Sequence, residues 1–359
     1  MKTKILIVDD SRIFRTAVQE GLSGESSIEV IGSVWNGIKA LEFLATNDPH
    51  IVTLDIQMPG MDGLETLEAI QEINAGRPAD KQIGVIMLSS HTKKGADITV
   101  KALEMGAYDF ISKPEGQNFR ENLQILCRQL KVKISNYTSK FIPATTKIQS
   151  AGRPSETKVS IDREAISYTP VVKAVLIGVS TGGPKALAEI IPPLCEGIDV
   201  PILIVQHMPP TFTESLARSL NAKSRYTVLE AKHDSPILRR HAYIAPGGRH
   251  MVLEKQGRET RIMINDLPPE KGCRPSIDKL FCSGADIFRQ HVIGVILTGM
   301  GTDGTEGGKK LKLYGAPILV QDEPTSVVWG MPGSACSAGI VDFTLPLQDI
   351  PDAIINMMH

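Results

Sequence analysis

Three residues that could perform acyl chemistry each follow a short apolar segment of the chain. Ser180 follows the run AVLIGV, His207 follows PILIVQ, and Asp303 lies in the turn after IGVIL. Apolar runs of this length are typical of buried parallel strands, whose carboxyl ends meet at one edge of a sheet. A nucleophilic serine, a basic histidine and an orienting aspartate at that edge would form an acyl-transfer triad.

The segment GVSTGGP around Ser180 indicates a turn from a strand into a helix. Its glycines permit an unusual backbone, and Pro184 suits the first turn of a helix. The segment lacks the G-x-G-x-x-G spacing of a dinucleotide loop, the Lys-Ser/Thr of a P-loop and the G-x-S-x-G of a hydrolase elbow. The backbone N–H groups of Thr181 and Met300, on two glycine-bearing turns, are the simplest donors for an oxyanion.

A second group of polar residues occurs at expected strand ends in the first third of the chain. Asp9 and Asp10 follow KILIV, Asp55 ends IVTLD, Ser89 follows IGVIML and Lys113 follows YDFIS. Three carboxylates at one sheet edge repel one another unless a cation lies between them, and oxygen ligands suit Mg²⁺. A carboxylate beside a divalent cation and a lysine could accept a phosphoryl group, because both positive groups would offset the added charge.

Strand and helix patterns alternate over residues 1–130 and again over 171–359. This alternation predicts two α/β domains, each a doubly wound and mostly parallel sheet. In the second domain we expect an antiparallel excursion around residues 226–265. Residues 131–170 are rich in Ser, Thr and Pro, carry more basic than acidic residues and lack apolar periodicity, which predicts a polar, basic linker. The strands expected in the first domain lie at 4–8, 28–34, 51–56, 83–88 and 108–113.

The composition argues against several other classes of protein. With 39 Lys and Arg against 40 Asp and Glu, the net charge of -1 favours neither nucleic acid nor a membrane surface. The five cysteines form no CxxC pair, which is typical of reduced thiols in a cytosolic protein. No stretch approaches the roughly 20 apolar residues of a membrane span, and the N-terminus does not resemble a signal peptide. We therefore expect a cytoplasmic protein without membrane insertion or a nucleic-acid partner.

The first 125 or so residues resemble a response-regulator receiver domain, through the motifs ILIVDDS, LDIQMPGMDG, MLSSHT and DFISKP. The resemblance implies a flavodoxin-like fold that is phosphorylated by a histidine kinase with the help of Mg²⁺. Phe110 would take the aromatic switch position, without the hydroxyl that many such domains carry there. The implied site consists of Asp55 as phosphoryl acceptor, Asp10 and Asp55 as metal ligands, Asp9 acting through water, the backbone carbonyl of Gln57 as a further metal ligand, and Ser89 and Lys113 as phosphoryl contacts.

Residues 171–359 resemble the catalytic domain of the chemotaxis protein-glutamate methylesterases, the CheB family. The motifs are IGVSTGGP, VQHMPPTFTESLA, YIAPGGRHM, CRPSIDKLF, LTGMGTDG and QDEPTSVVWGMPG, and the receiver-like region precedes them as in that family. The resemblance implies a Rossmann-like domain in which Ser180 is the nucleophile, His207 the base and Asp303 the orienting acid. Cys273 and Cys282 are small departures that we expect outside this triad.

The same resemblance implies a substrate and a form of control. The enzyme would hydrolyse glutamate γ-methyl esters and deamidate glutamines on chemoreceptors, and this acyl chemistry needs no cofactor. The receiver domain would cover the active site until Asp55 is phosphorylated. Phosphorylation would then shift a two-state equilibrium from the covered to the open arrangement.

Three other functions fit parts of the sequence. A phosphorylation-dependent binding module would require Ser180, His207 and Asp303 to be purely structural. A DNA-binding response regulator would require a basic output domain, whereas this second domain is large, strand-rich and not basic. A nucleotide-dependent enzyme would require a complete glycine loop in GVSTGGP. The motifs spread over nearly the whole chain favour the methylesterase over all three.

Overall fold

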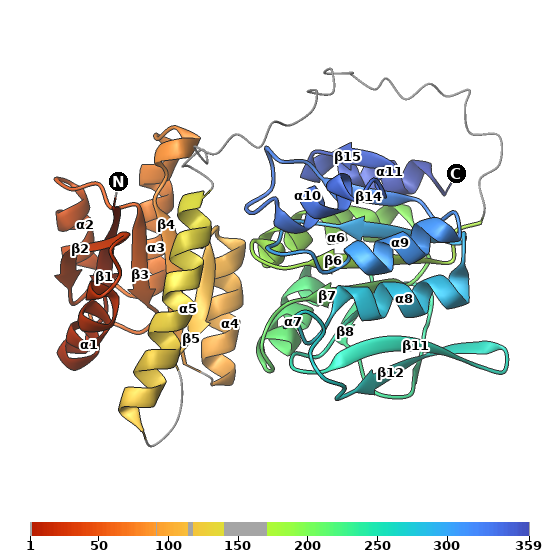
Figure 1. Ribbon diagram of the computed structural model, residues 1–359, viewed down its shortest axis with the longest axis horizontal. Coiled ribbons are helices and arrows are strands. Elements are labelled where there is room, and N and C mark those ends of the chain that lie inside the picture. Colours follow the sequence, from red (N-terminus) through yellow and green to blue (C-terminus); the bar gives the residue numbers. More distant parts are fainter. Residues whose placement is uncertain (1, 91, 114–117, 140–170, 359) are drawn as a thin grey trace.

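The computed structural model describes residues 2–90, 92–113, 118–139 and 171–358. These residues form two α/β domains that lie side by side (Figure 1). Each domain contains a parallel sheet with helices on both faces, so the predicted fold class is confirmed. Among the helices of these residues, none is long and apolar enough to cross a membrane.

The N-terminal domain is a five-stranded parallel sheet. Its strands are β1 (Thr3–Val8), β2 (Ile28–Val34), β3 (Ile51–Asp55), β4 (Gly84–Ser89) and β5 (Asp109–Ser112), and its helices are α1 (Arg12–Ser23), α2 (Gly37–Leu44), α3 (Gly63–Ala75), α4 (Lys93–Glu104) and α5 (Phe119–Ser139), with a short 3-10 turn η1 (Ala79–Lys81). The strand order β2-β1-β3-β4-β5 changes direction between β1 and β3. The carboxyl ends of these two strands therefore flank the crevice at the switch point, where α/β sheets bind ligands.

Helix caps explain where the chain turns after two of these strands. The Ser11 hydroxyl accepts the N–H of Phe14 and starts α1 directly after the acidic pair that follows β1. Asp62 and Glu65 form a capping box at the start of α3, which follows β3. Such caps satisfy the free N–H groups of a helix start. They hold the loops that carry the acidic residues.

Helix α5 extends into the segment that was predicted to be a linker. Residues 131–139 are its last part, so the predicted start of the linker at 131 is wrong. Leu130, Ile134 and Tyr137 are buried at a helical spacing, and the Tyr137 hydroxyl donates to the carbonyl of Gln82 at 2.6 Å. These contacts bury one face of an otherwise polar segment and so extend the helix. The rest of the predicted linker, 140–170, lies outside the described residues.

The C-terminal domain contains a seven-stranded parallel sheet and a three-stranded antiparallel sheet. Its strands are β6 (Ala174–Val179), β7 (Ile202–Gln206), β8 (Thr227–Glu230), β9 (Ser235–Pro236), β10 (His241–Ile244), β11 (His250–Gln256), β12 (Glu259–Asn265), β13 (Val292–Ile296), β14 (Ile318–Gln321) and β15 (Phe343–Leu345); its helices are α6 (Gly183–Gly197), α7 (Phe212–Lys223), α8 (Ile277–Phe288), α9 (Thr305–Leu313), α10 (Gly330–Ser337) and α11 (Ile350–Asn356), with a 3-10 turn η2 (Leu347–Asp349).

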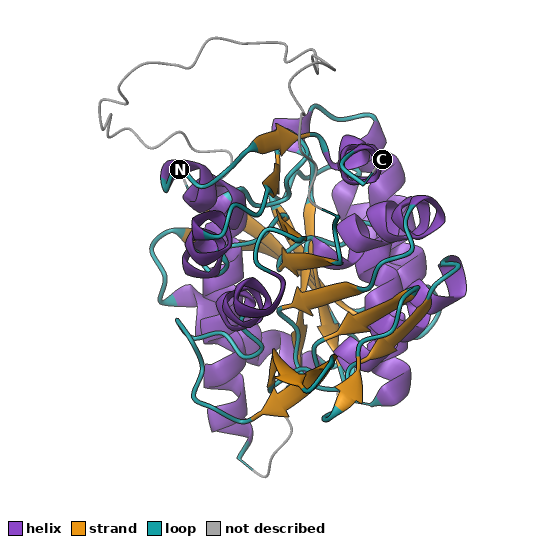
Figure 2. Ribbon diagram, turned by 90° about the vertical axis from the view of Figure 1, so that its right-hand side faces the viewer, coloured by secondary structure: helices purple, strands orange, loops and turns teal. Residues whose placement is uncertain are grey.

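The large sheet has the order β15-β14-β13-β6-β7-β10-β8 and changes direction between β6 and β13. One group of contacting helices comprises α6, α7 and α11, and another comprises α8, α9 and α10. In Figure 2 the strands lie between helices on both sides. The central strands β13, β6 and β7 are neighbours, so the turns that follow them meet at one edge of the sheet.

The antiparallel part is smaller than the predicted range 226–265. Strands β8 and β10 pair in parallel within the large sheet, and only β9, β11 and β12 pair antiparallel. The β11–β12 hairpin packs against α8, and its buried Met251 and Ile262 belong to the same apolar cluster as Phe281 of that helix. Alternating polarity indicates a half-buried strand but not its direction, which depends on how the connections run.

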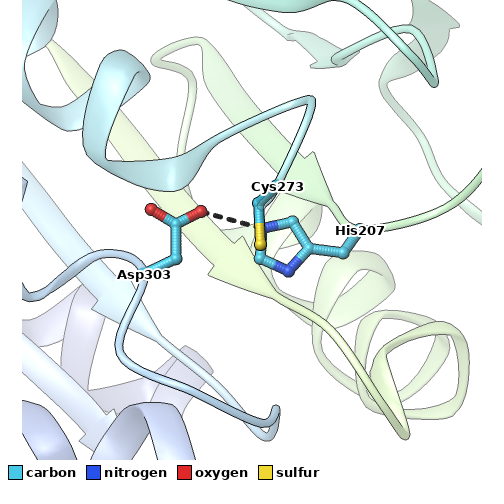
Figure 3. Close-up of side chains that lie close together, drawn as sticks. All are labelled: His207, Cys273 and Asp303. Carbon is cyan, nitrogen blue, oxygen red and sulfur yellow. Dashed lines mark hydrogen bonds and ion pairs between the residues drawn. The ribbon is translucent and has the colours of Figure 1, made fainter. Parts of the chain in front are cut away.

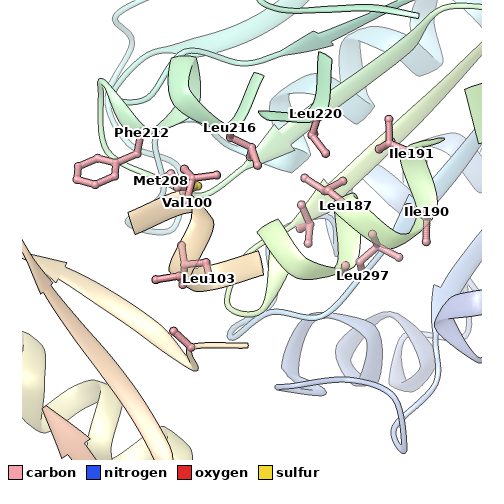
Figure 4. Packing of buried hydrophobic residues seen from close by; sticks show 14 of the residues in the cluster. Val100, Leu103, Leu187, Ile190, Ile191, Met208, Phe212, Leu216, Leu220 and Leu297 are labelled. Atoms are coloured by element: carbon pink, nitrogen blue, oxygen red, sulfur yellow. The ribbon is translucent and has the colours of Figure 1, made fainter. Parts of the chain in front are cut away.

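The two domains pack through α4, which contacts α7 and α6. Val100 and Leu103 of α4 belong to one buried apolar cluster with Met208 and Phe212 of the C-terminal domain (Figure 4). The ring centroids of Phe110 and Phe212 are 4.6 Å apart. Polar contacts accompany this cluster: Arg218 with Asp97, and Ser219 and Lys223 with Glu104, each at 2.6 Å.

Candidate active site

Ser180 lies in a tight turn between β6 and α6. Its backbone N–H donates to the Thr298 carbonyl, and its own carbonyl accepts the side-chain amide of Gln206, each at 3.0 Å. Gly182 has a φ of 80°, a left-handed conformation that glycine adopts without strain. A Cβ at Gly183 would lie 1.9 Å from Oε1 of Gln206, so this position also requires glycine. The glycines of GVSTGGP thus shape the turn that presents the serine.

His207 and Asp303 form a hydrogen-bonded pair, with 2.9 Å between Nε2 and Oδ2 (Figure 3). His207 follows β7 and Asp303 follows β13, and these strands are the two neighbours of β6, which ends directly before Ser180. Ser180 and His207 line the same cavity. Among the described residues no hydrogen bond joins the Ser180 hydroxyl to His207, and because Nε2 faces Asp303, Nδ1 is the nitrogen left for the serine.

The carboxylate of Asp303 caps the N-terminus of α8. The backbone N–H groups of the first two residues of this helix donate to it at 2.7 and 3.0 Å, and the Ser276 hydroxyl donates at 3.0 Å. Asp278 of the same helix accepts the N–H groups of Gly304 and Gly307, at the start of α9, at 2.9 and 2.8 Å. Asp278 was not among the residues predicted from the sequence, although its place just after the N-cap Ser276 is a recognisable signal.

These contacts set the protonation of the His–Asp pair. Burial lowers the pKa of His207, but hydrogen bonds with Asp303 and Cys273 outweigh it and raise the pKa to about 9. Burial raises the pKa of Asp303, but the hydrogen bond from His207 and the N–H groups of α8 lower it to about 2. An ionised Asp303 therefore faces a protonated His207 at neutral pH, and His207 must lose a proton before it can act as a base.

Cys273 lies against the His–Asp pair. Its sulfur, a ring nitrogen of His207 and a carboxylate oxygen of Asp303 all lie within 4.8 Å of one another (Figure 3). Cys273 was expected to lie outside the triad. It is not one of the three residues, yet its sulfur lies close to donor atoms of two of them. Cys273 lies in the loop that leads into α8, and the start of that helix binds Asp303. This position in the chain therefore indicates that Cys273 lies close to the pair.

The two expected oxyanion donors lie on turns that other contacts hold in place. The Thr298 hydroxyl donates to the carbonyl of Thr181 at 2.9 Å, and the Met331 N–H donates to the carbonyl of Gly299 at 2.8 Å. Within the described part of the chain, the N–H groups of Thr181 and Met300 donate to no other protein group. Both residues line the cavity that holds Ser180. These two donors are therefore available to a bound anion.

The N-terminal domain covers this cavity. The cavity has a volume of about 570 Å³ and is lined by the turns around Ser180 and His207 on one side and by β5 and α5 on the other. The Thr181 hydroxyl donates to the Asp109 carboxylate at 3.3 Å, and Lys133 of α5 also donates to Asp109, at 2.6 Å. A residue of one domain thus contacts the residue that follows the candidate nucleophile in the other.

The acidic residues of the N-terminal domain meet at the switch point of its sheet. Asp9, Asp10 and Asp55 bring carboxylate oxygens within 4.8 Å of one another. Lys113 bridges two of them, with its Nζ 2.8 Å from Asp9 and 2.9 Å from Asp55. Burial and the neighbouring Asp9 raise the pKa of Asp55, while Lys113 opposes them. Oxygen donors with an exposed Asp10 on the outer side fit Mg²⁺, which keeps several waters.

Two other residues predicted for this site differ in their exposure. Gln57 is exposed in the turn after β3, close in sequence to Asp55. Ser89 is fully buried, and its hydroxyl accepts a hydrogen bond from Thr99 of α4 at 2.6 Å. Contact with a phosphoryl group would require this hydroxyl to turn away from α4, the helix that packs on the C-terminal domain.

Comparisons with known proteins match both domains. Family models for the CheB methylesterase and the response regulator receiver domain match residues 175–354 and 5–124. Proteins named protein-glutamate methylesterase/protein-glutamine glutaminase from Trichodesmium erythraeum (strain IMS101) and Desulfotalea psychrophila (strain LSv54 / DSM 12343) are 40% and 41% identical, and the matches cover 99% and 98% of both chains. The crystal structure of the Thermotoga maritima CheB methylesterase catalytic domain is 41% identical over 98% of its chain and 52% of this one, with a TM-score of 0.51. The resemblance inferred from the motifs is confirmed: the chain belongs to the CheB methylesterase family and joins that enzyme's domain to an N-terminal receiver domain.

Proposed function

We propose that the protein is a phosphorylation-controlled hydrolase that demethylates glutamate γ-methyl esters and deamidates glutamines on chemoreceptors. The observation that carries this proposal is the His207–Asp303 pair, which lies with Ser180 on adjoining strand ends beneath the receiver domain. The name shared by the full-length relatives supports the two reactions. We further propose a receiver domain up to residue 139 and a catalytic domain from residue 171.

The acyl chemistry follows from the placement of three side chains. The Ser180 oxygen attacks the ester carbonyl carbon, and Nδ1 of His207 takes the hydroxyl proton and then gives it to the departing methanol. Asp303 holds the ring by its hydrogen bond to Nε2 and stabilises the imidazolium. Water then hydrolyses the acyl-enzyme by the same route. A glutamine carboxamide offers an equivalent carbonyl and releases ammonia in place of methanol.

The N–H groups of Thr181 and Met300 are the proposed donors to the oxyanion. They are free of other protein partners within the described residues, and they lie on the two turns beside Ser180. Because these donors belong to the backbone of well-held turns, they are oriented before the negative charge develops.

The receiver domain acts as the proposed switch. It covers the cavity through β5 and α5, which leaves little room for a receptor helix. Asp9, Asp10 and Asp55 would hold Mg²⁺, which would supply positive charge to offset the phosphoryl group that Asp55 receives from a histidine kinase. The Ser89 hydroxyl would then leave Thr99 of α4 and bind the phosphoryl group, which weakens the packing of α4 on α7. A substrate on receptor cytoplasmic segments gives the protein a cytoplasmic location.

Methanol release from methylated receptor fragments tests this function. Full-length protein, Ser180→Ala and Asp55→Asn are compared with and without acetyl phosphate and Mg²⁺. We expect release by the wild type to rise with the phosphodonor, release by Asp55→Asn to stay at the basal level, and release by Ser180→Ala to be lost. Full activity of folded Ser180→Ala would refute the nucleophile, and equal activation of Asp55→Asn would refute the switch.

A further inference from the structure

One side chain next to the proposed triad has no part in the acyl chemistry. Cys273 is partly exposed, and its sulfur lies within 4.8 Å of a nitrogen of His207 and an oxygen of Asp303 (Figure 3). The three residues come from three separate loops, after β7, before α8 and after β13. The fold thus gathers a nitrogen, a sulfur and an oxygen donor at one point.

This donor set matches the coordination chemistry of Zn²⁺. Zinc binds thiolate sulfur at about 2.3 Å, imidazole nitrogen at about 2.0 Å and carboxylate oxygen at about 2.0–2.2 Å. Donors around one tetrahedral ion are then roughly 3–4 Å apart, so donors within 4.8 Å need only small side-chain movements. The cluster of Asp9, Asp10 and Asp55 offers oxygen alone, which suits Mg²⁺. The two clusters therefore differ in the metal that they would select.

The surroundings of the cluster also fit a metal site. Asp303 is held by the N-terminus of α8 and by the Ser276 hydroxyl, as outer contacts commonly hold metal ligands. His207 and Cys273 are each partly exposed, so an ion can reach them from solvent. Three protein ligands leave a fourth position for water, as in open zinc sites.

We propose that His207, Cys273 and Asp303 form a site for Zn²⁺ and that Zn²⁺ bound there switches off the hydrolase. The ion displaces the Nε2 proton of the His207 imidazolium and replaces the hydrogen bond between His207 and Asp303. This proton and the proton of the Cys273 thiol are released to solvent. A neutral imidazole bound through Nε2 carries its proton on Nδ1. Nδ1 then has no lone pair to accept the Ser180 proton, and the nucleophile stays unactivated.

Metal binding can be measured independently of the hydrolase, whereas the inhibitory effect rests on the proposed function. Full-length protein is first titrated with Co²⁺, a spectroscopic substitute for Zn²⁺, in excess Mg²⁺ that is added to fill the receiver site. Zn²⁺ is then added to compete with the bound Co²⁺. We expect a thiolate-to-cobalt charge-transfer band in the wild type. Cys273→Ser should lose that band and bind Zn²⁺ at least ten-fold more weakly, because the replaced thiolate is a direct ligand. Cys282 is another partly exposed cysteine and lies in α8, and Cys282→Ser should bind both metals as the wild type does.

Methanol release is then measured with and without Zn²⁺, for each variant relative to its own metal-free rate. We expect Zn²⁺ to inhibit the wild type and Cys282→Ser, a chelator to restore their activity, and Cys273→Ser to need at least ten-fold more Zn²⁺. Should Cys273→Ser fail to fold, the alkylation rate of Cys273 in the wild type, followed by mass spectrometry, should fall when Zn²⁺ is present.

Each contrary outcome has a separate meaning. Absence of the band from the wild type, a band retained in Cys273→Ser, or alkylation indifferent to Zn²⁺ would overturn the site. Binding without loss of methanol release, or with increased release, would overturn its inhibitory role. No methanol release from metal-free, phosphorylated wild type would refute the proposed function, while the Co²⁺ titration would still decide the site.

Discussion

The hydroxyl of Thr181 donates to the carboxylate of Asp109 at 3.3 Å and so joins the two domains at the residue after Ser180. The N–H of this same Thr181 is a proposed oxyanion donor. The receiver therefore contacts the part of the active site where negative charge would develop, and it brings a carboxylate there. We therefore expect both the covering of the cavity and the negative charge of Asp109 to act against catalysis.

We expect Asp109→Asn to raise the basal, unphosphorylated hydrolase activity by up to about five-fold. The change removes the negative charge beside Thr181 and weakens the hydrogen bonds that Asp109 accepts from Thr181 and Lys133. A single hydrogen bond contributes about 1 kcal/mol. Methanol release without phosphodonor measures the effect. Asp48→Asn alters an exposed receiver aspartate that pairs with Arg77, and it should leave the basal rate unchanged. An unchanged basal rate in Asp109→Asn would show that this carboxylate does not restrain the enzyme.

Loss of the apolar contact between the domains should also raise basal activity. Leu103 is buried in the cluster that α4 shares with the C-terminal domain, and Leu103→Ala removes much of that contact. Replacing a buried leucine with alanine costs about 2–5 kcal/mol of stability. Here this cost falls partly on the folding of the receiver domain and partly on the packing of the two domains. Basal methanol release should increase, and acetyl phosphate should add less to it than in the wild type. Circular dichroism separates this result from unfolding, and a fully preserved activation ratio would contradict it.

Asp278 should act as a positioning residue for Asp303. In Asp278→Ala the N–H groups of Gly304 and Gly307 lose their acceptor, at a cost of about 1–3 kcal/mol for each buried group left unpaired. The turn carrying Asp303 should shift, and kcat should fall by about ten-fold or more with little change in KM. Asp278→Asn keeps an oxygen acceptor and should recover much of this loss. Asp286→Ala, on the exposed side of α8, is the matched control.

Asp303→Asn should reduce kcat by several orders of magnitude while the protein stays folded. An amide in place of the carboxylate weakens its acceptor role toward His207 and the start of α8, and it favours the wrong tautomer of the ring. Steady-state methanol release gives the rate, and thermal unfolding reports on the fold. A variant with near wild-type kcat would remove Asp303 from the triad.

The pH dependence of the unphosphorylated enzyme should reflect His207. Its pKa is raised to about 9, so the neutral base becomes more populated as pH rises through that value, and kcat/KM should rise with it. The stabilising contacts of the imidazolium are fully present below the ordinary histidine pKa of about 6.5. They are lost as pH rises through about 9, so folding stability should fall over that interval while activity increases. A pH profile with an inflection near 6.5 would contradict the raised pKa.

Local sequence patterns were sufficient to predict many of the strands and turns of this molecule. Apolar runs that lead to Asp55, Ser180 or His207 predicted both the strands and the residues at their ends. This was possible because a short run of apolar residues is itself enough to indicate a buried strand and the point where it ends. The glycines after Ser180 likewise predicted a turn that the structure builds. The family motifs, spread along both domains, predicted the relationship that the comparisons confirm.

Tertiary structure alone decided the contacts between segments that are distant in sequence. Strand order placed His207 and Asp303 on either side of Ser180, and loop packing brought Cys273 and the start of α8 to that pair. Burial against the receiver sheet extended α5 beyond residue 130, although its surface residues look like those of a linker. The contact between Asp109 and Thr181 depends on how two folded domains pack. None of these can be read from local periodicity, because each results from the free energy of packing many separate segments together.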